Sequence, residues 1–272
     1  MKRFTDRIAV VTGAASGIGR ATSVALAQRG CDLAIVDLNE EGLAETAAHI
    51  EKTGRKVTQH IVDVADRAQM KALADTVVEA HGAVHIVINN AGVTVSASFA
   101  RQSLDDFEWL MGINFWGVIH GCKFFLPHLG RAEEAHIVNI SSLFGLIGVP
   151  TQTSYCASKF AVRGFSDALR FELEDTRVGL TCVHPGGINT NIIRNSRYTE
   201  ERRYGTRARI QRVFDRAMPP EEAANLIVDA IAHNKERLLI TREAHLGDLV
   251  MRLLPQRLSA RLLTKARRKL GM

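Results

Sequence analysis

Long apolar segments are missing from this sequence of 272 residues: no run reaches about eighteen consecutive apolar residues, the length that a membrane-spanning helix requires. A spanning helix is therefore excluded. Residues 1–7 are rich in charge and the apolar stretch that follows is short and broken by glycines, so we expect no signal peptide. Linkers, repeats and low-complexity segments are also lacking. A chain of this length can bury a sizeable core as one domain.

Cysteine is scarce, and neither cysteine nor histidine is clustered. The four cysteines, Cys31, Cys122, Cys156 and Cys182, stand singly without metal-ligand spacing, so we interpret them as small buried hydrophobes. Cys156 neighbours Tyr155, but in a helix its side chain leaves about 100° away, which favours packing over chemistry. The ten histidines have no metal spacing either. We expect a reduced, cytoplasmic protein without a metal site.

The segment around residue 155 carries side chains suited to proton transfer. Tyr155 and Lys159 are four residues apart, so in a helix both leave the same face one turn apart. An ammonium beside a phenol favours the phenolate and lowers the tyrosine pKa from its usual value of about 10. Ser142, at the end of an expected strand over 135–140, could donate a hydrogen bond to the same substrate oxygen. This pattern indicates acid–base chemistry at an alcohol or ketone, which needs a hydride carrier.

A glycine-rich turn near the N-terminus indicates where that carrier binds. The apolar run 8–12 is typical of a buried parallel strand, and the segment 13–19 that follows it contains three glycines before a helical pattern. Such a turn lets backbone N–H groups and a helix N-terminus approach a pyrophosphate. The next apolar run, 33–36, ends in Asp37, eighteen residues past Gly19, the spacing expected for a carboxylate that holds the adenosine ribose.

These features share the order and spacing of one family. The sequence resembles the short-chain dehydrogenase/reductase family over roughly residues 5 to 241. The matching motifs are TGAASGIG at 12–19, DV at 63–64, NNAG at 89–92, Asn114, Ser142, YCASK at 155–159 and PG at 185–186. The resemblance implies that Tyr155 is the acid/base, that Lys159 lowers its pKa and holds the nicotinamide ribose, that Ser142 orients the substrate oxygen, and that Asn114 anchors a water of the proton relay.

The resemblance also implies a cofactor site. Asp63 and Val64 would flank the adenine, Asn90 would contact the cofactor from the end of the fourth strand, and Thr190 would hold the carboxamide. The full set of implied cofactor contacts is Gly13, Ser16, Gly17, Ile18, Gly19, Asp37, Asp63, Val64, Asn90, Ala91, Gly92, Tyr155, Lys159, Pro185, Gly186, Ile188 and Thr190.

The choice between NAD and NADP is an electrostatic question. A 2′-phosphate would lie against the carboxylate of Asp37, and the two negative charges would repel. Binding of NADP would favour a basic residue at Ser16 or Leu38, and neither position has one. Arg20 is near, but it belongs to the start of the helix. We predict NAD(H), with an NADP(H)-dependent carbonyl reductase of the same family as the alternative.

Alternation of apolar strands and helices predicts a single-domain α/β Rossmann fold. Further strands are expected at 57–62, 86–89, 180–183 and 238–240, giving a doubly wound parallel sheet of about seven strands with helices on both faces and a C-terminal helical extension. We place the dehydrogenase domain at 1–244 and a basic amphipathic extension at 245–272. By resemblance, the helices at about 104–126 and 154–174 form a dimer face, so a homodimer or homotetramer is expected.

Positive charge is concentrated in two segments, whereas the whole chain carries +6. The first, 191–217, has a balance of +5 and lies where the family has its substrate lid. Its arginines bind an anionic handle on the substrate, for which Arg194, Arg197 and Arg203 are the candidates, or they form an ordinary solvated surface; both interpretations stay open. The predicted substrate-pocket residues are Ser142, Phe144, Leu146, Ile192 and Tyr198, with Ile193, Arg194 and Tyr204 as further candidates.

The second basic segment, 252–272, carries +7 and no acidic residue. From Leu246 onward apolar residues recur at the helical period, which predicts an amphipathic helix. Such a helix can dock within an oligomer, or it can lie on an anionic membrane surface; both interpretations stay open. Phosphate neutralisation alone would permit nucleic-acid binding, but aromatic residues are not interleaved with the basic ones, so we expect no nucleic-acid partner.

Two classes of function remain. The first is an NAD-dependent oxidoreductase that acts on a secondary alcohol or ketone, and the apolar pocket candidates suggest a lipophilic substrate such as a steroid or an acyl chain. The second is a non-catalytic dinucleotide-binding sensor or scaffold, which the fold alone does not exclude. The complete set of Ser142, Tyr155, Lys159 and Asn114 favours the enzyme, because a sensor has no need of a tuned phenol.

Overall fold

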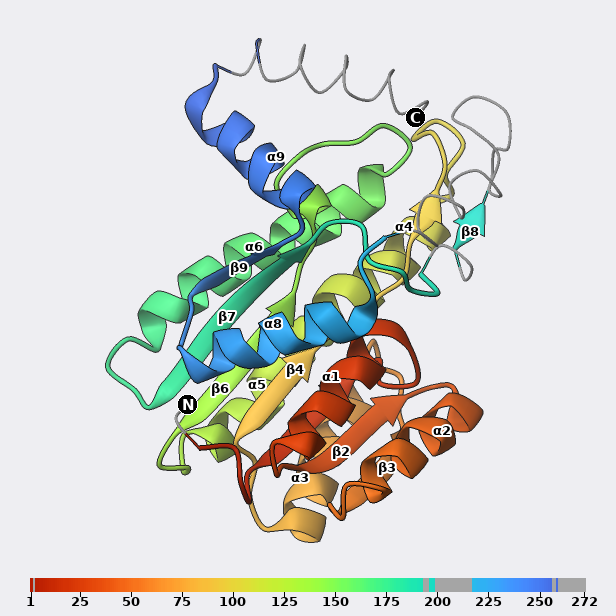
Figure 1. The fold of residues 1–272 in the computed structure, drawn as a ribbon. Helices are drawn as coiled ribbons and strands as arrows, with labels where there is room; N and C mark the ends of the chain where they lie inside the picture. Colours follow the sequence, from red (N-terminus) through yellow and green to blue (C-terminus); the bar gives the residue numbers. More distant parts are fainter. Residues whose placement is uncertain (2, 193–195, 199–216, 256–257, 259–272) are drawn as a thin grey trace.

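The computed structural model describes residues 1, 3–192, 196–198, 217–255 and 258 of the chain (Figure 1). Among these residues the central sheet has seven strands in the order β3-β2-β1-β4-β6-β7-β9, and all its pairings are parallel. The strands are β1 (Ile8–Thr12), β2 (Asp32–Asp37), β3 (Val57–Ile61), β4 (Ile86–Asn89), β6 (Ala135–Ile140), β7 (Val178–Pro185) and β9 (Arg237–Ile240). The strand order reverses at β1, which lies between β2 and β4, so a ligand crevice is expected at the carboxyl ends of these strands.

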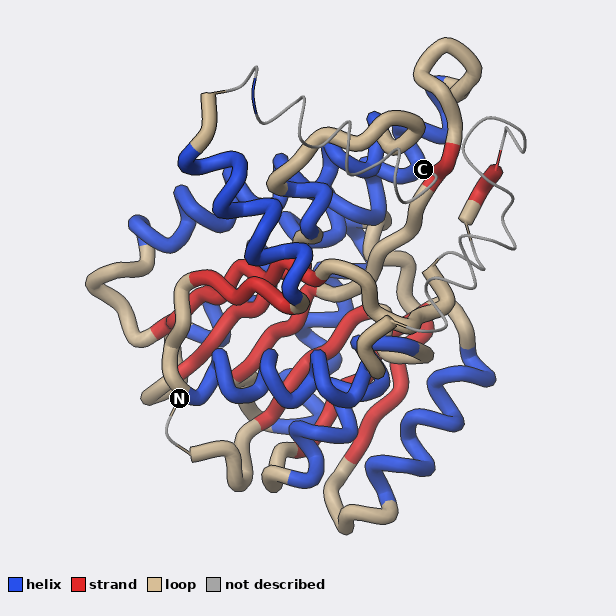
Figure 2. The backbone as a smooth tube through the Cα atoms, turned by 45° about the horizontal axis from the view of Figure 1, so that its top comes forward, coloured by secondary structure: helices blue, strands red, loops and turns tan. Residues whose placement is uncertain are grey.

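Helices cover both faces of the sheet, as Figures 1 and 2 show. On one face α1 (Gly17–Gln28), α2 (Glu40–Glu51) and α8 (Pro220–Ala232) share a core in which Leu26 and Ile227 are fully buried. On the other face α3 (Arg67–His81), α5 (Gly117–Leu129) and α6 (Thr153–Glu172) share a core that contains Phe125 and Val162. The predicted doubly wound α/β fold is confirmed.

Burial on both faces explains why the central strands do not show a polar face. Every residue of β1 and of β6 is buried, so neither strand alternates between polar and apolar side chains. The strands expected from the sequence are all present, with ends displaced by two residues or fewer. The four cysteines are free and buried, as expected.

The helix expected at about 104–126 is interrupted. It divides into α4 (Leu104–Met111), a π-helical segment at Gly112–Trp116 and α5. The π segment carries Asn114, which is fully buried. Widened turns of this kind are rare and are frequent at functional sites.

The chain continues from β9 into α9 (Arg242–Leu253), which packs on the body of the protein. Asp248 makes two hydrogen bonds with Arg237, of 2.6 and 3.1 Å, and Gly247 lies against Leu143, where an added Cβ would be only 2.8 Å from the leucine Cδ1. The opposite side of α9 exposes Leu246, Leu249 and Leu253, at 63, 53 and 70%. Residues 259–272 lie outside the described part of the chain. Within that part, no helix is both long and apolar enough to cross a membrane.

Candidate active site

The four residues predicted to be catalytic come together where the strands of the sheet end. Ser142 follows β6, Asn114 lies in the π segment, and Tyr155 and Lys159 lie in the first two turns of α6. Gly92, just after β4, lies next to two of them: a Cβ at this position would be 3.4 Å from Asn114 Oδ1 and 3.5 Å from Lys159 Nζ. The carboxyl edge of the sheet thus gathers residues from four separate segments of the chain.

Tyr155 lies in a protected, largely apolar environment. It is 9% exposed, and the ring of Phe144 meets its ring edge-on, with centroids 6.1 Å apart. Burial raises the pKa of Tyr155 to about 12, although a hydrogen bond with Ser142 acts in the opposite direction. The net shift is opposite to the lowering predicted from the spacing of Tyr155 and Lys159, because desolvation of the phenolate is the largest cause.

Lys159 is buried beside Tyr155 and held by the end of β6. Its side chain is 3% exposed, and Nζ donates a 2.9 Å hydrogen bond to the carbonyl oxygen of Ile140. Nζ lies 5.8 Å from the centroid of the Tyr155 ring. Burial lowers the pKa of Lys159 to about 8, because the charged form loses its hydration. At neutral pH Lys159 therefore still carries its proton, and this desolvated ammonium lies beside the Tyr155 ring.

The side chain of Asn114 links two segments of the site by hydrogen bonds. Its Oδ1 accepts a hydrogen bond from the amide of Val93 (2.8 Å), and its Nδ2 donates to the carbonyl of Val93 (2.9 Å) and to Ser158 Oγ (3.2 Å). Ser158 in turn donates to the carbonyl of Tyr155 (2.8 Å). The side-chain amide of Asn114 therefore links the segment after β4 to the first turn of α6.

The glycine turn lies against the segment that follows β4. An added Cβ at Gly13 would be 2.8 Å from the Cα of Ala91, and an added Cβ at Gly19 would collide with the carbonyl of Gly13. Asn90 closes the turn, because its Nδ2 donates to the carbonyls of Thr12 and Gly13, at 2.9 and 3.1 Å. The predicted cofactor residues of the two motifs are thus in direct contact with one another.

Thr12 is a residue of this site that the sequence reasoning left out. Its Oγ1 accepts hydrogen bonds from the amides of Asn90 (3.0 Å) and Ala91 (3.1 Å), which ties the end of β1 to the segment after β4. Its position at the start of the TGAASGIG motif was the available signal. A role based on backbone contacts from a second motif could not be read from that position alone.

The remaining predicted cofactor residues border the same edge of the sheet. Asp37 ends β2, and its two carboxylate oxygens accept from the amides of Ala15 (3.0 Å) and Asn39 (3.1 Å). Gly17 has φ of +54°, and an added Cβ would be 3.0 Å from Thr190 Cγ2. Ser16 is the N-cap of α1, and Gly17, Ile18 and Gly19 form the first residues of that helix. Asp63 and Val64 follow β3, and Pro185 ends β7. The amide of Gly186 donates to the carbonyl of Ile240, and Ile188 is 3% exposed.

Comparison with known proteins now decides the family. The model of short chain dehydrogenases matches residues 7–201. The chain is 42% identical over 259 residues to SadH of Mycobacterium tuberculosis, which is named as an oxidoreductase, and the match covers 93% of each protein. This protein belongs to the short-chain dehydrogenase/reductase family.

Two further relatives show the range of this family. The chain is 32% identical to the 3-oxoacyl-acyl-carrier-protein reductase FabG of Thermotoga maritima, over 83% of this chain and 90% of that protein. A crystal structure of a short-chain dehydrogenase/reductase from Burkholderia phymatum in complex with NAD superposes with a TM-score of 0.82, at 34% identity, over 93% of this chain and 94% of that one. The protein is an oxidoreductase of this family with a Rossmann-like fold.

In this dehydrogenase/reductase the side of the site beyond Tyr155 is apolar. Of the predicted substrate residues, Phe144 and Ile192 pack in the same cluster as Tyr155. Leu146 is 2% exposed and lies outside that cluster. Tyr198 belongs to the short strand β8 (Arg197–Tyr198), which pairs with β5 (Val95–Ser96), and its side chain lies outside the described part of the protein. The cluster also contains residues that sequence reasoning missed: Val93, Val95, Ala97, Trp109 and Leu110.

Arg197 is already engaged where the lid segment begins. Its guanidinium bonds Asp106 of α4 at 2.6 Å and lies 3.6 Å from the centroid of the Trp109 ring. This ion pair and stacking contact make Arg197 a structural anchor rather than an available handle for an anion. Arg194, Arg203, Ile193 and Tyr204 lie outside the described residues. In the part of the chain that is described, no group of histidine, cysteine and acidic residues is arranged to hold a metal ion.

Proposed function

We propose that this protein transfers a hydride between NAD(H) and a lipophilic secondary alcohol or ketone, with Tyr155 as the general acid/base. The observation that carries the proposal is the convergence of Ser142, Tyr155 and Lys159 beside the glycine turn. A dinucleotide fits this edge of the sheet. The N-cap residue Ser16 makes no side-chain capping bond and the first turn of α1 holds no acidic residue, so free backbone N–H groups can meet a pyrophosphate.

The protein's part of the reaction is proton transfer and orientation. Bound NAD supplies the hydride acceptor. In reduction, neutral Tyr155 donates its proton to the substrate oxygen; in oxidation, Tyr155 must first be deprotonated and then takes the proton of the hydroxyl group. Ser142 fixes the position of that oxygen through a hydrogen bond. Because burial raises the pKa of Tyr155 to about 12, the residue starts as an acid, and we expect oxidation to accelerate as the pH rises.

Two contacts support NAD over NADP. Asp37 is held at the end of β2 by the amide of Ala15 in the glycine turn, and its carboxylate would repel a 2′-phosphate on the adenosine ribose. Arg20 points into α2, since it bonds Thr46 (3.0 Å) and forms an ion pair with Glu45 (2.7 Å). Its charge is therefore compensated and does not attract a phosphate. Parallel titrations with NADH and NADPH test this preference, and tighter binding of NADPH would reverse the assignment.

The lipophilic nature of the substrate is inferred from the cluster around Tyr155. This apolar cluster packs Phe144, Trp109 and Leu110 around Tyr155. An apolar wall of this kind suits a steroid or an acyl chain. The similarity to FabG, whose name denotes an acyl ketone substrate, supports the second of these chemistries. Because Arg197 is paired with Asp106, we propose that this apolar wall, rather than an arginine that binds an anionic group, determines which substrates bind.

We further propose a homo-oligomer in which the C-terminal extension, 245–272, docks on a second copy. The exposed leucines of α9 need a partner, and the basic segment 252–272 complements the acidic remainder of the chain, which carries −6 once the +5 and +7 segments are subtracted from +6. Light scattering and flotation with vesicles of anionic phosphatidylglycerol, before and after removal of residues 256–272, test this. Loss of the oligomer on truncation supports docking; loss of vesicle binding instead indicates a membrane surface.

The activity is tested by absorbance of reduced nicotinamide during a screen of secondary alcohols with NAD. We expect turnover with long-chain or ring-bearing alcohols and little with short polar ones. A protein that binds NADH tightly and turns over none of the alcohols or their ketones would instead be a dinucleotide-binding sensor.

A further inference from the structure

A histidine outside the predicted catalytic set touches the serine loop. His184 lies near the end of β7, has no exposed surface, and its Nδ1 lies 3.1 Å from the carbonyl oxygen of Ser142. The same carbonyl also accepts a 2.9 Å hydrogen bond from the amide of Gly145, which closes the short 3₁₀ turn at Leu143–Gly145. A carbonyl oxygen has two lone pairs, so the turn uses one and His184 uses the other.

The hydrogen bond defines the protonation of the ring. A carbonyl can only accept, so Nδ1 carries the proton and donates it to Ser142. Nε2 is buried and has no hydrogen-bond partner in the described part of the chain. Burial lowers the pKa of His184 to about 4, so the imidazole is neutral at physiological pH and the proton on Nδ1 is its only one.

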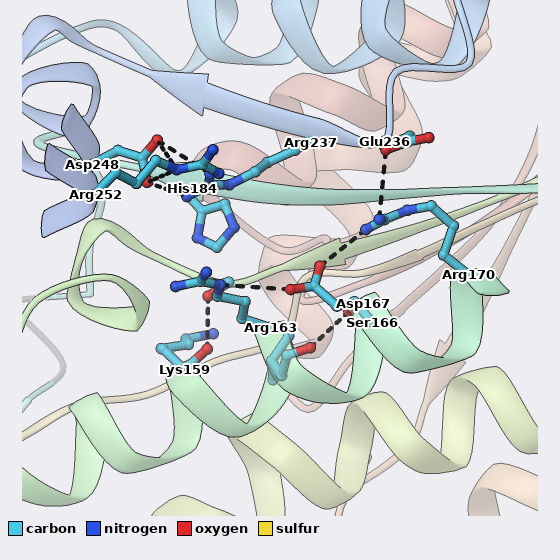
Figure 3. Close-up of polar contacts among 12 residues, drawn as sticks. Lys159, Arg163, Ser166, Asp167, Arg170, His184, Glu236, Arg237, Asp248 and Arg252 are labelled. Atoms are coloured by element: carbon cyan, nitrogen blue, oxygen red, sulfur yellow. Dashed lines mark hydrogen bonds and ion pairs between the residues drawn. The ribbon is translucent and has the colours of Figure 1, made fainter.

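Charged groups surround the ring but are paired among themselves. Figure 3 shows the His184 ring between the pair Arg237–Asp248 and the pair Arg163–Asp167. Arg237 and Arg163 disfavour a second proton on the ring, whereas Asp167 favours it. Among the described residues, the Ser142 carbonyl is the one hydrogen-bond acceptor of this side chain.

The rest of the serine loop shows what this bond adds. The residue before Ser142 is fixed from two sides, because the amide of Ser141 donates to Val183 and its Oγ donates to the carbonyl of Lys159, each at 2.8 Å. Ser142 Oγ accepts from the amide of Phe144 (3.1 Å) within its own turn. In the part of the chain that the structure describes, the hydrogen bond from His184 is the one that ties the peptide after Ser142 to the sheet.

We propose that His184 is a positioning residue, which holds the Ser142 peptide against β7 and thereby keeps the Ser142 hydroxyl beside Tyr155. This inference rests on the proposed function. Burying an imidazole with an unpartnered nitrogen is unfavourable compared with burying a leucine, so the ring is expected to be present for its Nδ1–H rather than for its volume. A shift of the serine of about 1 Å lowers the rate about a hundredfold when alignment is lost.

The activity test compares two substitutions. His184→Asn keeps a donor near the position of Nδ1, and His184→Leu fills the volume without a donor. We expect His184→Leu to lower kcat about tenfold to a hundredfold with KM and the NADH dissociation constant changed less than about threefold, and His184→Asn to recover most of kcat. Equal losses in both variants, or full kcat in His184→Leu, would overturn the proposal.

A second measurement does not depend on turnover. In wild-type protein, ¹⁵N NMR of the histidine rings should show His184 as the neutral Nδ1–H tautomer from pH 5 to 9, a form that is less common in free imidazole side chains. A dominant Nε2–H tautomer would refute the hydrogen bond and the proposal with it. If the tautomer is found but no alcohol is turned over, the proposed function fails while the placement of the Ser142 peptide by His184 stands.

Discussion

Lys159 offers a test of whether the site sacrifices stability for chemistry. Its ammonium is buried, and the lowered pKa means that the folded protein binds its proton more weakly than the unfolded chain does. Replacement of Lys159 by Met keeps the length of the side chain and removes the charge. The substitution should therefore stabilise the protein at neutral pH, although it removes a residue of the proposed catalytic set.

The magnitude follows from the pKa change from 10.5 to about 8. Each pKa unit corresponds to about 1.4 kcal/mol, so burial of the charged form costs roughly 3 kcal/mol. Methionine also leaves the Ile140 carbonyl without the 2.9 Å bond from Nζ, which costs about 1–2 kcal/mol. The balance at pH 7 is a gain of about 1–2 kcal/mol for Lys159→Met.

The sign of the stability difference between Lys159→Met and wild type changes with pH. Below pH 8 the lysine is charged in both states and its full burial cost applies; between pH 8 and 10.5 the folded protein releases the proton first, so wild-type stability rises relative to the variant. At pH 10 the difference should have moved by roughly 2–3 kcal/mol, which leaves Lys159→Met the less stable protein.

Urea unfolding of both proteins at pH 7 and pH 10 measures this, and the same change at the exposed Lys71 of α3 controls for loss of a surface charge. An equal difference between wild type and Lys159→Met at the two pH values would refute the argument from burial.

The other predictions concern the cofactor and the lid. Asp37→Ser combined with Leu38→Arg should weaken NADH binding and strengthen NADPH binding, each about tenfold, because the repelling carboxylate is replaced by an exposed guanidinium; unchanged NADH and NADPH dissociation constants would contradict the assignment of Asp37. Arg197→Ala should raise KM for a lipophilic substrate about threefold to tenfold with no effect on NADH binding, since it frees β8 from Asp106 and Trp109. Arg197→Lys should not restore KM, because lysine lacks the planar group that stacks on the indole; a KM equal to wild type in Arg197→Ala would show that the anchor has no role.

Much of the fold was predictable because both faces of the sheet are covered. A strand buried on both sides is typically an apolar run, so β1 could be located from hydrophobicity. The buried strand β6 was less plain, because it includes His136 and Asn139. The order of strand, glycine turn, helix and terminal acid then placed Asp37 at the end of β2. Motif spacing likewise brought Tyr155 and Lys159 onto one face of α6.

What the sequence could not show depends on packing. The π segment carries Asn114, whose buried side-chain amide bonds Val93, and no local residue pattern encodes this segment. The sequence predicts a lowered pKa for Tyr155, whereas burial raises it. The spacing of Tyr155 and Lys159 reveals that the two side chains are close but not that the phenol is desolvated. Leu146 was predicted to line the pocket from its nearness to Ser142 in sequence, yet its side chain is packed outside the cluster around Tyr155.

In the proposed reaction Tyr155 exchanges the proton of the reacting oxygen. The most direct measurement is turnover of the best alcohol by Tyr155→Phe, together with NADH binding by the same protein. We expect a dissociation constant for NADH within about twofold of wild type and a loss of kcat of about a thousandfold, since only the phenolic oxygen is removed. Turnover by Tyr155→Phe close to that of the wild type would contradict it.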